Sequence, residues 1–195
     1  VTVTLTVATV PVTTTDGSGY YRFRVETEEP ISVTADLPAG YFRTTPGAIF
    51  TDNVLGLTQT INFGYAPTTS TFGVIYGTVF YDANHDGSQG LGEGGLAGVP
   101  ITSTEAATPS VTTGPFGGYT LHYASSGSTT VYETNPAFYV STTPDAVVAT
   151  VVTGTAGSSP VDFGDFMGVK ITGQVFDDVN VNGANDDGGT GVAGA

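Results

Sequence analysis

The sequence contains no cysteine, no tryptophan and one methionine, and only 4 of its 195 residues are lysine or arginine. The absence of cysteine excludes a disulfide framework. Nucleic-acid binding depends on clustered basic side chains that release counterions from the phosphates, so nucleic acid is excluded as a partner. No stretch approaches the roughly 20 consecutive apolar residues of a membrane-spanning helix, so we expect no membrane insertion.

The residues that are abundant favour β-structure. Threonine, valine, tyrosine and phenylalanine dominate, and β-branched and aromatic side chains suit the half-buried surface of a sheet. The 28 glycines and 11 prolines supply turns, and a hydrophobic content of 39% is sufficient for packed cores. The 18 acidic residues give a net charge of −14, so the chain repels itself unless a cation neutralises it.

Short runs with a period of two recur along the chain, beginning with residues 1–7, in which valine or leucine alternates with threonine. This period is typical of a strand with one buried face. No window of 11 or more residues has the periodicity of a helix. The pattern therefore predicts an all-β sandwich. The predicted strands are residues 1–7, 21–25, 31–35, 58–63, 74–81, 119–123, 129–133, 146–152 and 169–176.

An internal repeat organises these strands. The longest match has an offset of 96 (173 − 77), and two shorter ones have offsets of 98 (135 − 37) and 100 (161 − 61). Repeats of this kind indicate modules of one fold. One complete module is therefore expected at 67–167. The matched pairs are residues 77–99 with 173–195, 135–144 with 37–46, and 161–164 with 61–64.

The second module is expected to be split. Its opening lies at 168–195 and its body at 1–66, and the module closes when Val1 of one copy follows Ala195 of another. Either the chain is one period of a longer tandem protein, or separate subunits complete each other head to tail. Both alternatives give a linear fibre whose partners are copies of the same chain.

Residues 82–93 follow the spacing of a calcium-binding loop, Asp-x-Asn-x-Asp-Gly followed by a glutamate at loop position 12. Alternate oxygens can point at one centre, Gly87 permits the sharp turn, and the terminal glutamate can close the shell with both oxygens. The alternative is an Asp/Asn/Gly-rich surface turn that binds nothing. The predicted ligands are Asp82, Asn84, Asp86, the backbone carbonyl of Ser88, and Glu93.

The second copy of this loop, at 178–189, departs from the pattern because Gly189 stands where the closing glutamate should be. Either of two aspartates could supply the missing carboxylate. Without the bidentate ligand we expect weaker calcium binding, and the alternative is a degenerate turn with no metal. The candidate ligands are Asp178, Asn180, Asn182, Asp186 and Asp187.

The motif Gly-x-Val-Phe-x-Asp-x-Asn-x-[Asp/Asn]-Gly, followed by Gly-[Leu/Val]-Ala-Gly, Pro-Ala-x-Tyr and [Asp/Asn]-Phe-Gly, occurs in both modules. It resembles the SD-repeat B-type (SdrD B-like, collagen-adhesin B-type) domains of bacterial surface proteins. The resemblance implies transthyretin-like or immunoglobulin-like sandwiches at the cell surface or outside the cell, stiffened by calcium and joined into stalks or fibres. It assigns ligand roles to Asp82, Asn84, Asp86 and Glu93, and to Asp178, Asn180 and Asn182.

Two other classes of function compete with a structural fibre. We expect no enzymatic activity, because the two histidines, His85 and His122, lie in the calcium loop and in a predicted strand, and no nucleophile motif is present. The alternative function is a ligand- or carbohydrate-binding adhesin module. Its candidate aromatic platform is Tyr41, Phe42, Phe138 and Tyr139, although recurrence in both modules favours a packing role.

Threonine clusters that we expect to be exposed suggest O-linked glycans as further partners. Strand propensity by itself already accounts for much of the threonine. The clusters are residues 13–15, 68–69, 129–130 and 142–143.

Overall fold

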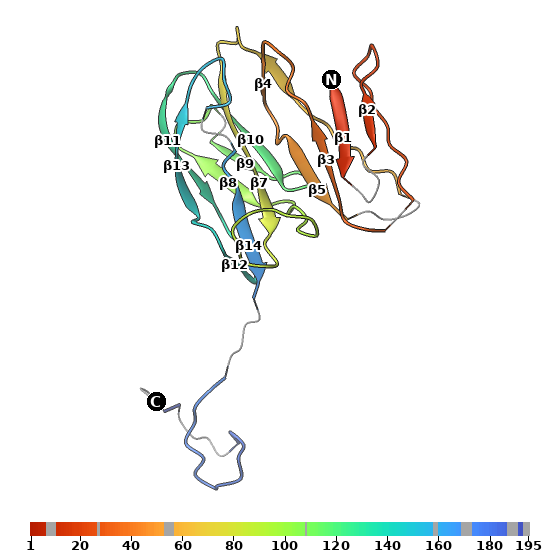
Figure 1. The fold of residues 1–195 in the computed structure, drawn as a ribbon. Helices are drawn as coiled ribbons and strands as arrows, with labels where there is room; N and C mark the ends of the chain where they lie inside the picture. Colours follow the sequence, from red (N-terminus) through yellow and green to blue (C-terminus); the bar gives the residue numbers. More distant parts are fainter. Residues whose placement is uncertain are drawn as a thin grey trace.

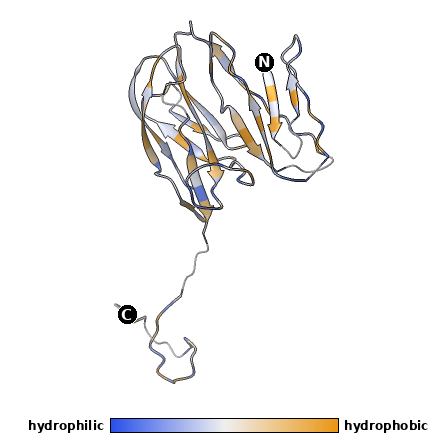
Figure 2. Ribbon diagram, in the orientation of Figure 1, coloured by the Kyte–Doolittle hydropathy of each residue, from blue (hydrophilic) through white to orange (hydrophobic). Residues whose placement is uncertain are grey.

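The computed structural model shows an all-β protein, as the sequence predicts (Figure 1). The described part of the chain contains fourteen strands and no helix, so it offers no helix that could span a membrane. Figure 2 shows hydrophobic residues concentrated in the strands. The structure describes residues 1–6, 11–26, 28–52, 57–107, 109–157, 160–168, 173–186 and 191–192.

The C-terminal half is a sandwich of two four-stranded sheets, with orders β10-β7-β14-β12 and β13-β11-β8-β9. Alternate residues of each sheet face the other sheet, and Ile75, Leu121, Ile101 and Val131 are wholly buried between them. The central strand β7 pairs antiparallel with β10 and parallel with β14. The strands are β7 (Gly73–Tyr81), β8 (Pro100–Ser103), β9 (Ser110–Thr112), β10 (Gly118–Tyr123), β11 (Gly127–Glu133), β12 (Tyr139–Ser141), β13 (Ala146–Val151) and β14 (Phe163–Met167).

The N-terminal half contains a four-stranded sheet of order β2-β1-β3-β5 and a two-stranded sheet, β4-β6. Its buried core is Val3, Leu5, Ile31, Val33 and Ala35. The strands are β1 (Thr2–Thr6), β2 (Val12–Thr14), β3 (Ile31–Ala35), β4 (Tyr41–Arg43), β5 (Ala48–Thr51) and β6 (Tyr65–Pro67).

The two halves share one topology and one register. The ladder β2-β1-β3-β5 repeats as β9-β8-β11-β13, and Thr2↔Thr14 corresponds to Pro100↔Thr112 at an offset of 98 (100 − 2). The pair β4–β6 repeats as β12–β14. Within the described part of the N-terminal half, no strand corresponds to β7 or to its partner β10.

The prediction of strands at 21–25 and 58–63 is therefore wrong. The counterpart of 21–25 in the C-terminal half is β10, which pairs with β7, and without such a neighbour the N-terminal segment has no ladder to join. The counterpart of 58–63 leads into β14, which pairs with β7 only from Phe163 onward. The side chains of Tyr21, Phe23 and Val25 still turn inward and are half-buried. Of the predicted strand at 169–176, residues 169–172 lie outside the described residues, and Phe176 forms only an isolated bridge with Gly191.

The two halves contact each other through the outer face of the β7 sheet. Phe42 on β4 is buried against Val74 and Tyr76 of β7. The Thr120 hydroxyl on β10 donates a hydrogen bond to the Thr44 carbonyl at 2.6 Å. Residues 173–186, in contrast, lie away from the strands of both halves (Figure 1).

Besides the buried acids of residues 82–93, two further buried acids lie in the C-terminal half. Asp165 on β14 is 0% exposed and Glu133 on β11 is 6% exposed. Neither oxygen of Asp165 accepts a hydrogen bond, and neither does Oε1 of Glu133. Burial, together with the charges of Asp165 and Asp145, raises the pKa of Glu133 to about 8. Burial and the charge of Asp145 raise the pKa of Asp165 to about 6.

This burial predicts that the fold loses stability as the pH rises. A carboxyl group whose pKa is higher in the folded than in the unfolded state stabilises the fold at low pH. This stabilisation is lost as the pH rises through the folded pKa, which is near 8 for Glu133. The melting temperature in EDTA should fall between about pH 5 and about pH 9, and Glu133→Gln should flatten that fall. Glu105→Gln, at an exposed position of the same half, is the control. Equal pH slopes for the two variants would contradict the assignment.

Candidate metal centre

The loop at 82–93 begins where β7 ends and is held at its base by the sandwich. The Tyr81 N–H donates to the Gly94 carbonyl at 2.9 Å, and the Asp82 N–H donates to the Asp165 carbonyl at 2.8 Å. Phe80 and Gly95 form an isolated bridge beneath the loop. Both ends of the loop are therefore attached to the central strand.

Three predicted ligands share one turn. Oδ1 and Oδ2 of Asp82 accept hydrogen bonds from the N–H groups of Asp86 (3.2 Å) and Gly87 (2.9 Å). Oδ1 of Asn84 accepts from the same Asp86 N–H at 2.8 Å. His85 and Gly87 have φ values of 63° and 74°, the left-handed backbone that this turn requires. Asp82, Asn84 and Asp86 thus surround a single turn of the chain.

Glu93 closes the loop from its far end. Its Oε1 accepts hydrogen bonds from the N–H groups of Ala83 (3.1 Å) and Asn84 (3.3 Å), and its Oε2 accepts from Gly90 (2.8 Å). Gln89, which the sequence analysis missed because the motif leaves that position undefined, donates from its side chain to the Glu93 carbonyl at 2.9 Å. Glu93 is therefore positioned against the start of the loop.

The electrostatics of the loop favour a cation. Asp82 and Glu93 are buried, and within the described residues the lysine and arginine side chains form no ion pair with either of them. Burial raises the pKa of Asp82, but hydrogen bonding from the Thr142 side chain and from backbone N–H groups together outweighs it and holds the pKa below its usual range. Asp82 is therefore ionised at neutral pH, and a buried anion without a partner charge is costly.

The donor set fits calcium, because carboxylate, amide and carbonyl oxygens are hard ligands and calcium tolerates irregular geometry. Each Asp82 oxygen and Oε2 of Glu93 accepts one of these backbone N–H groups and keeps a second lone pair for a metal, whereas Oε1 of Glu93 accepts two. No three histidine, cysteine, aspartate or glutamate side chains form a metal cluster by themselves within the described ranges. The candidate centre therefore also needs the Asn84 amide and the backbone carbonyl predicted at Ser88.

The second loop repeats the turn of the first, 96 residues later (178 − 82). The Asn182 N–H donates to Oδ1 of both Asp178 and Asn180 at 3.1 Å, as Asp86 does in the first loop. The Gly183 N–H donates to Oδ2 of Asp178 at 2.7 Å, as Gly87 does to Asp82. Val181 and Gly183 have φ values of 56° and 80°. Local sequence therefore suffices to form the turn.

The second loop differs in how it is closed. Asp186 points into it and accepts hydrogen bonds from Nδ2 of Asn180 (3.2 Å) and Asn182 (3.1 Å), which hold the pKa of Asp186 below its usual range. Asp187 and Gly189 lie outside the described residues. Asp178 is only partly buried, whereas its counterpart Asp82 is fully buried.

The aromatic residues considered for an adhesive platform do not share one environment. Phe42 is buried in the contact between the halves, and Tyr139 packs edge-on against Tyr81 with ring centroids 6.5 Å apart. Tyr41 and Phe138 are exposed.

Two further predicted positions take part in packing. The His85 ring lies edge-on to Phe166 at 4.1 Å. Thr129 is buried and hydrogen bonded to Ser103, so the expectation that it is exposed is wrong, because it lies on the inner face of β11.

Comparison with known proteins yields one structural neighbour to report. The chain is similar to GBS52, a minor pilin of the gram-positive pathogen Streptococcus agalactiae, with a TM-score of 0.38 and 14% identity over 85% of this chain and 72% of that one. No protein-family model and no curated sequence matches the chain. A likeness at this TM-score carries no functional argument.

Calcium should stabilise the C-terminal half. A ligand present at 100 times its Kd adds roughly 2.7 kcal/mol to the free energy of unfolding. Calorimetry should show a higher melting temperature in calcium than in EDTA, and Asp82→Asn should remove most of the difference. Asp178→Asn is the matched control in the second loop, and most of the difference in melting temperature between calcium and EDTA should remain in this variant. A melting curve that is the same in calcium and in EDTA would contradict the metal centre.

Terbium should report the two loops separately. Terbium replaces calcium at oxygen-ligated sites, and a tyrosine beside it sensitises its luminescence. Tyr81 directly precedes the first loop, whereas Asp177 precedes the second, and the chain has no tryptophan. Sensitised emission should therefore be lost in Asp82→Asn, fall strongly in Tyr81→Phe, and persist in Asp178→Asn. Emission that survives Asp82→Asn unchanged would place the metal elsewhere.

Proposed function

We propose that this chain is a structural repeat unit of an extracellular, calcium-stiffened fibre or surface stalk that assembles head to tail. The observation that carries the proposal is the repetition of one topology, one register and one loop within a single chain. Modules that repeat in line and touch only their neighbours are the basis of extended proteins. On this proposal the ligand is calcium and the partners are further copies of the chain.

The proposal assigns residues 67–167 to one complete module and residues 168–195 plus 1–66 to a second, completed between copies. In support, strands β7–β14 pair only among themselves, as do β1–β6, and each set has its own core. Contacts between different surfaces of successive copies propagate without closing into a ring. This is the geometry that a linear fibre requires.

The location of the first calcium loop supports a stiffening role. Gly87, Ser88 and Gln89 line a cavity of about 420 Å³ together with Ala48 and Phe50 of the N-terminal half. The loop therefore borders the joint between the halves as well as the end of β7. A metal that holds this loop would restrict motion at the joint, which is where a chain of modules bends.

Assembly should depend on concentration and on calcium. We expect sedimentation velocity in calcium to show oligomers that lengthen as the protein concentration rises, and negative-stain images to show linear particles. Calcium should promote assembly because it neutralises part of the net charge of −14. EDTA should shorten the particles. A single monomeric species at all concentrations, with and without calcium, would contradict the proposal.

A further inference from the structure

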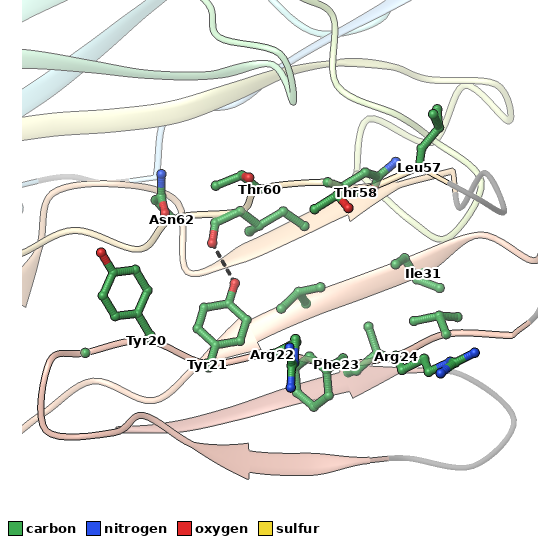
Figure 3. A pocket seen from close by; sticks show the side chains of 16 residues that line it. Tyr20, Tyr21, Arg22, Phe23, Arg24, Ile31, Leu57, Thr58, Thr60 and Asn62 are labelled. Atoms are coloured by element: carbon green, nitrogen blue, oxygen red, sulfur yellow. Dashed lines mark hydrogen bonds between the residues drawn. The ribbon is translucent and has the colours of Figure 1, made fainter.

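The N-terminal half has an open groove at the position that β7 occupies in the C-terminal half. The groove has a volume of about 550 Å³, with one wall formed by residues 19–25 and the other by residues 57–62 (Figure 3). Its floor includes the core residues Leu5, Ile31 and Val33. In the C-terminal half, β10 and the residues leading into β14 form the equivalent walls, and β7 runs between them.

One wall of the groove is less buried than its counterpart in the C-terminal half. On β10, Leu121 is 0% exposed and its neighbours of the same face are equally inaccessible. Their counterparts Tyr21, Phe23 and Val25, 98 residues earlier (121 − 23), alternate inward in the same way but are only partly buried. The floor residues Leu5, Ile31 and Val33 are buried, so the accessible apolar surface of the groove lies along its two walls.

The two walls are already held at the spacing of an occupied site. The Tyr119 hydroxyl donates to the Val161 carbonyl at 2.6 Å, and this bond crosses over β7 at Gly77. In the N-terminal half the Tyr21 hydroxyl donates to the Ile61 carbonyl, also at 2.6 Å (Figure 3). The bridge is therefore present in both halves, with a strand beneath it in one and none in the other.

The bridge sets a requirement for the strand that enters. A Cβ atom on Gly77 would collide with the Val161 carbonyl and crowd the Tyr119 ring, so the residue under the bridge must be glycine. In the internal repeat the counterpart of Gly77 is Gly173, and the counterpart of the buried Val79 is Val175. In this structure Val175 is 59% exposed and a Cβ on Gly173 would meet nothing within 4 Å.

We infer that residues 173–177 of a second copy enter this groove as the missing strand. Gly173 then lies under the Tyr21–Ile61 bridge, Val175 faces the core, and Gln174 lies opposite Tyr20. Strand addition of this kind takes affinity from backbone hydrogen bonds and specificity from alternate side chains. The inference rests on the head-to-tail assembly proposed above and specifies its acceptor site, its donor segment and their register.

Disulfide trapping tests the register, and the chain has no cysteine of its own. In the C-terminal half, the pair that corresponds to Gln174 and Tyr20 is Thr78↔Gly118. The next pair, Val79 and Gly117, is joined by the hydrogen bond from the Val79 N–H to the Gly117 carbonyl, so Thr78↔Gly118 is a non-hydrogen-bonded pair. Side chains in such pairs lie close together. Tyr20→Cys protein mixed with Gln174→Cys protein should therefore form a disulfide-linked heterodimer under mild oxidation. Val181→Cys, at an exposed position of the same segment, is the control and should give only background.

A second variant tests the glycine requirement without disturbing the free chain. Gly173→Val should weaken assembly by roughly tenfold or more, because it overpacks the space beneath the bridge. Gln174→Val is the matched control, since its counterpart Thr78 already carries a β-branched side chain. It should assemble like the unmodified chain.

The outcomes separate this inference from the proposed function. Equal cross-linking of Cys pairs 20/174 and 20/181, or normal assembly of Gly173→Val, would overturn the groove even where sedimentation shows oligomers. Absence of oligomers together with failure of the 20/174 cross-link would overturn both the groove and the fibre. A specific 20/174 cross-link in a protein that forms no fibre would uphold the groove and overturn the fibre.

Discussion

The structure depends on a central strand that is buried on both faces. Eight of the nine residues of β7 are buried, and the strand pairs with β10 on one side and with β14 on the other. It also leads directly into the candidate metal loop at 82–93 and carries the glycine beneath the Tyr119 bridge. Where such a strand is present, the sandwich is closed. Where it is absent, as in the N-terminal half, the counterpart of β10 remains extended but forms no ladder, and its inward side chains stay half-buried.

Acidic side chains create a second constraint, and the structure meets it in two different ways. In the first loop, backbone N–H groups hold Asp82 and Glu93 in place, and the negative charge they retain suits a metal ion. In the core, Glu133 and Asp165 have no such donors for most of their oxygens, so burial favours their protonated forms. Their counterparts in the N-terminal half are Ala35 and Tyr65, so the pH response should belong to the C-terminal half.

Assembly between copies would use the same interactions as folding within one. The Tyr21 bridge repeats the 2.6 Å hydrogen bond of the Tyr119 bridge, and the internal repeat places a glycine, Gly77 or Gly173, at the matching position of both donor strands. A sheet with a missing strand leaves open edges that attract another chain. In this protein, Gly173 under the Tyr21–Ile61 bridge and Val175 toward the core would restrict strand addition to one register. Calcium bound at 82–93 would act separately, on the joint between the two halves.

The sequence by itself determined the features that depend on near neighbours. The period-two runs placed β1, β3, β7, β10 and β11, and the Asp-x-Asn-x-[Asp/Asn]-Gly spacing determined the turn of both loops, because each turn is held by hydrogen bonds within six residues. Only the tertiary structure decided the rest. Residues 21–25 have the strand pattern but no ladder, Thr129 and Glu133 are buried although polar, and Tyr21 reaches Ile61 across 40 residues. Each of these depends on which distant segment lies alongside, and a local pattern does not contain that information.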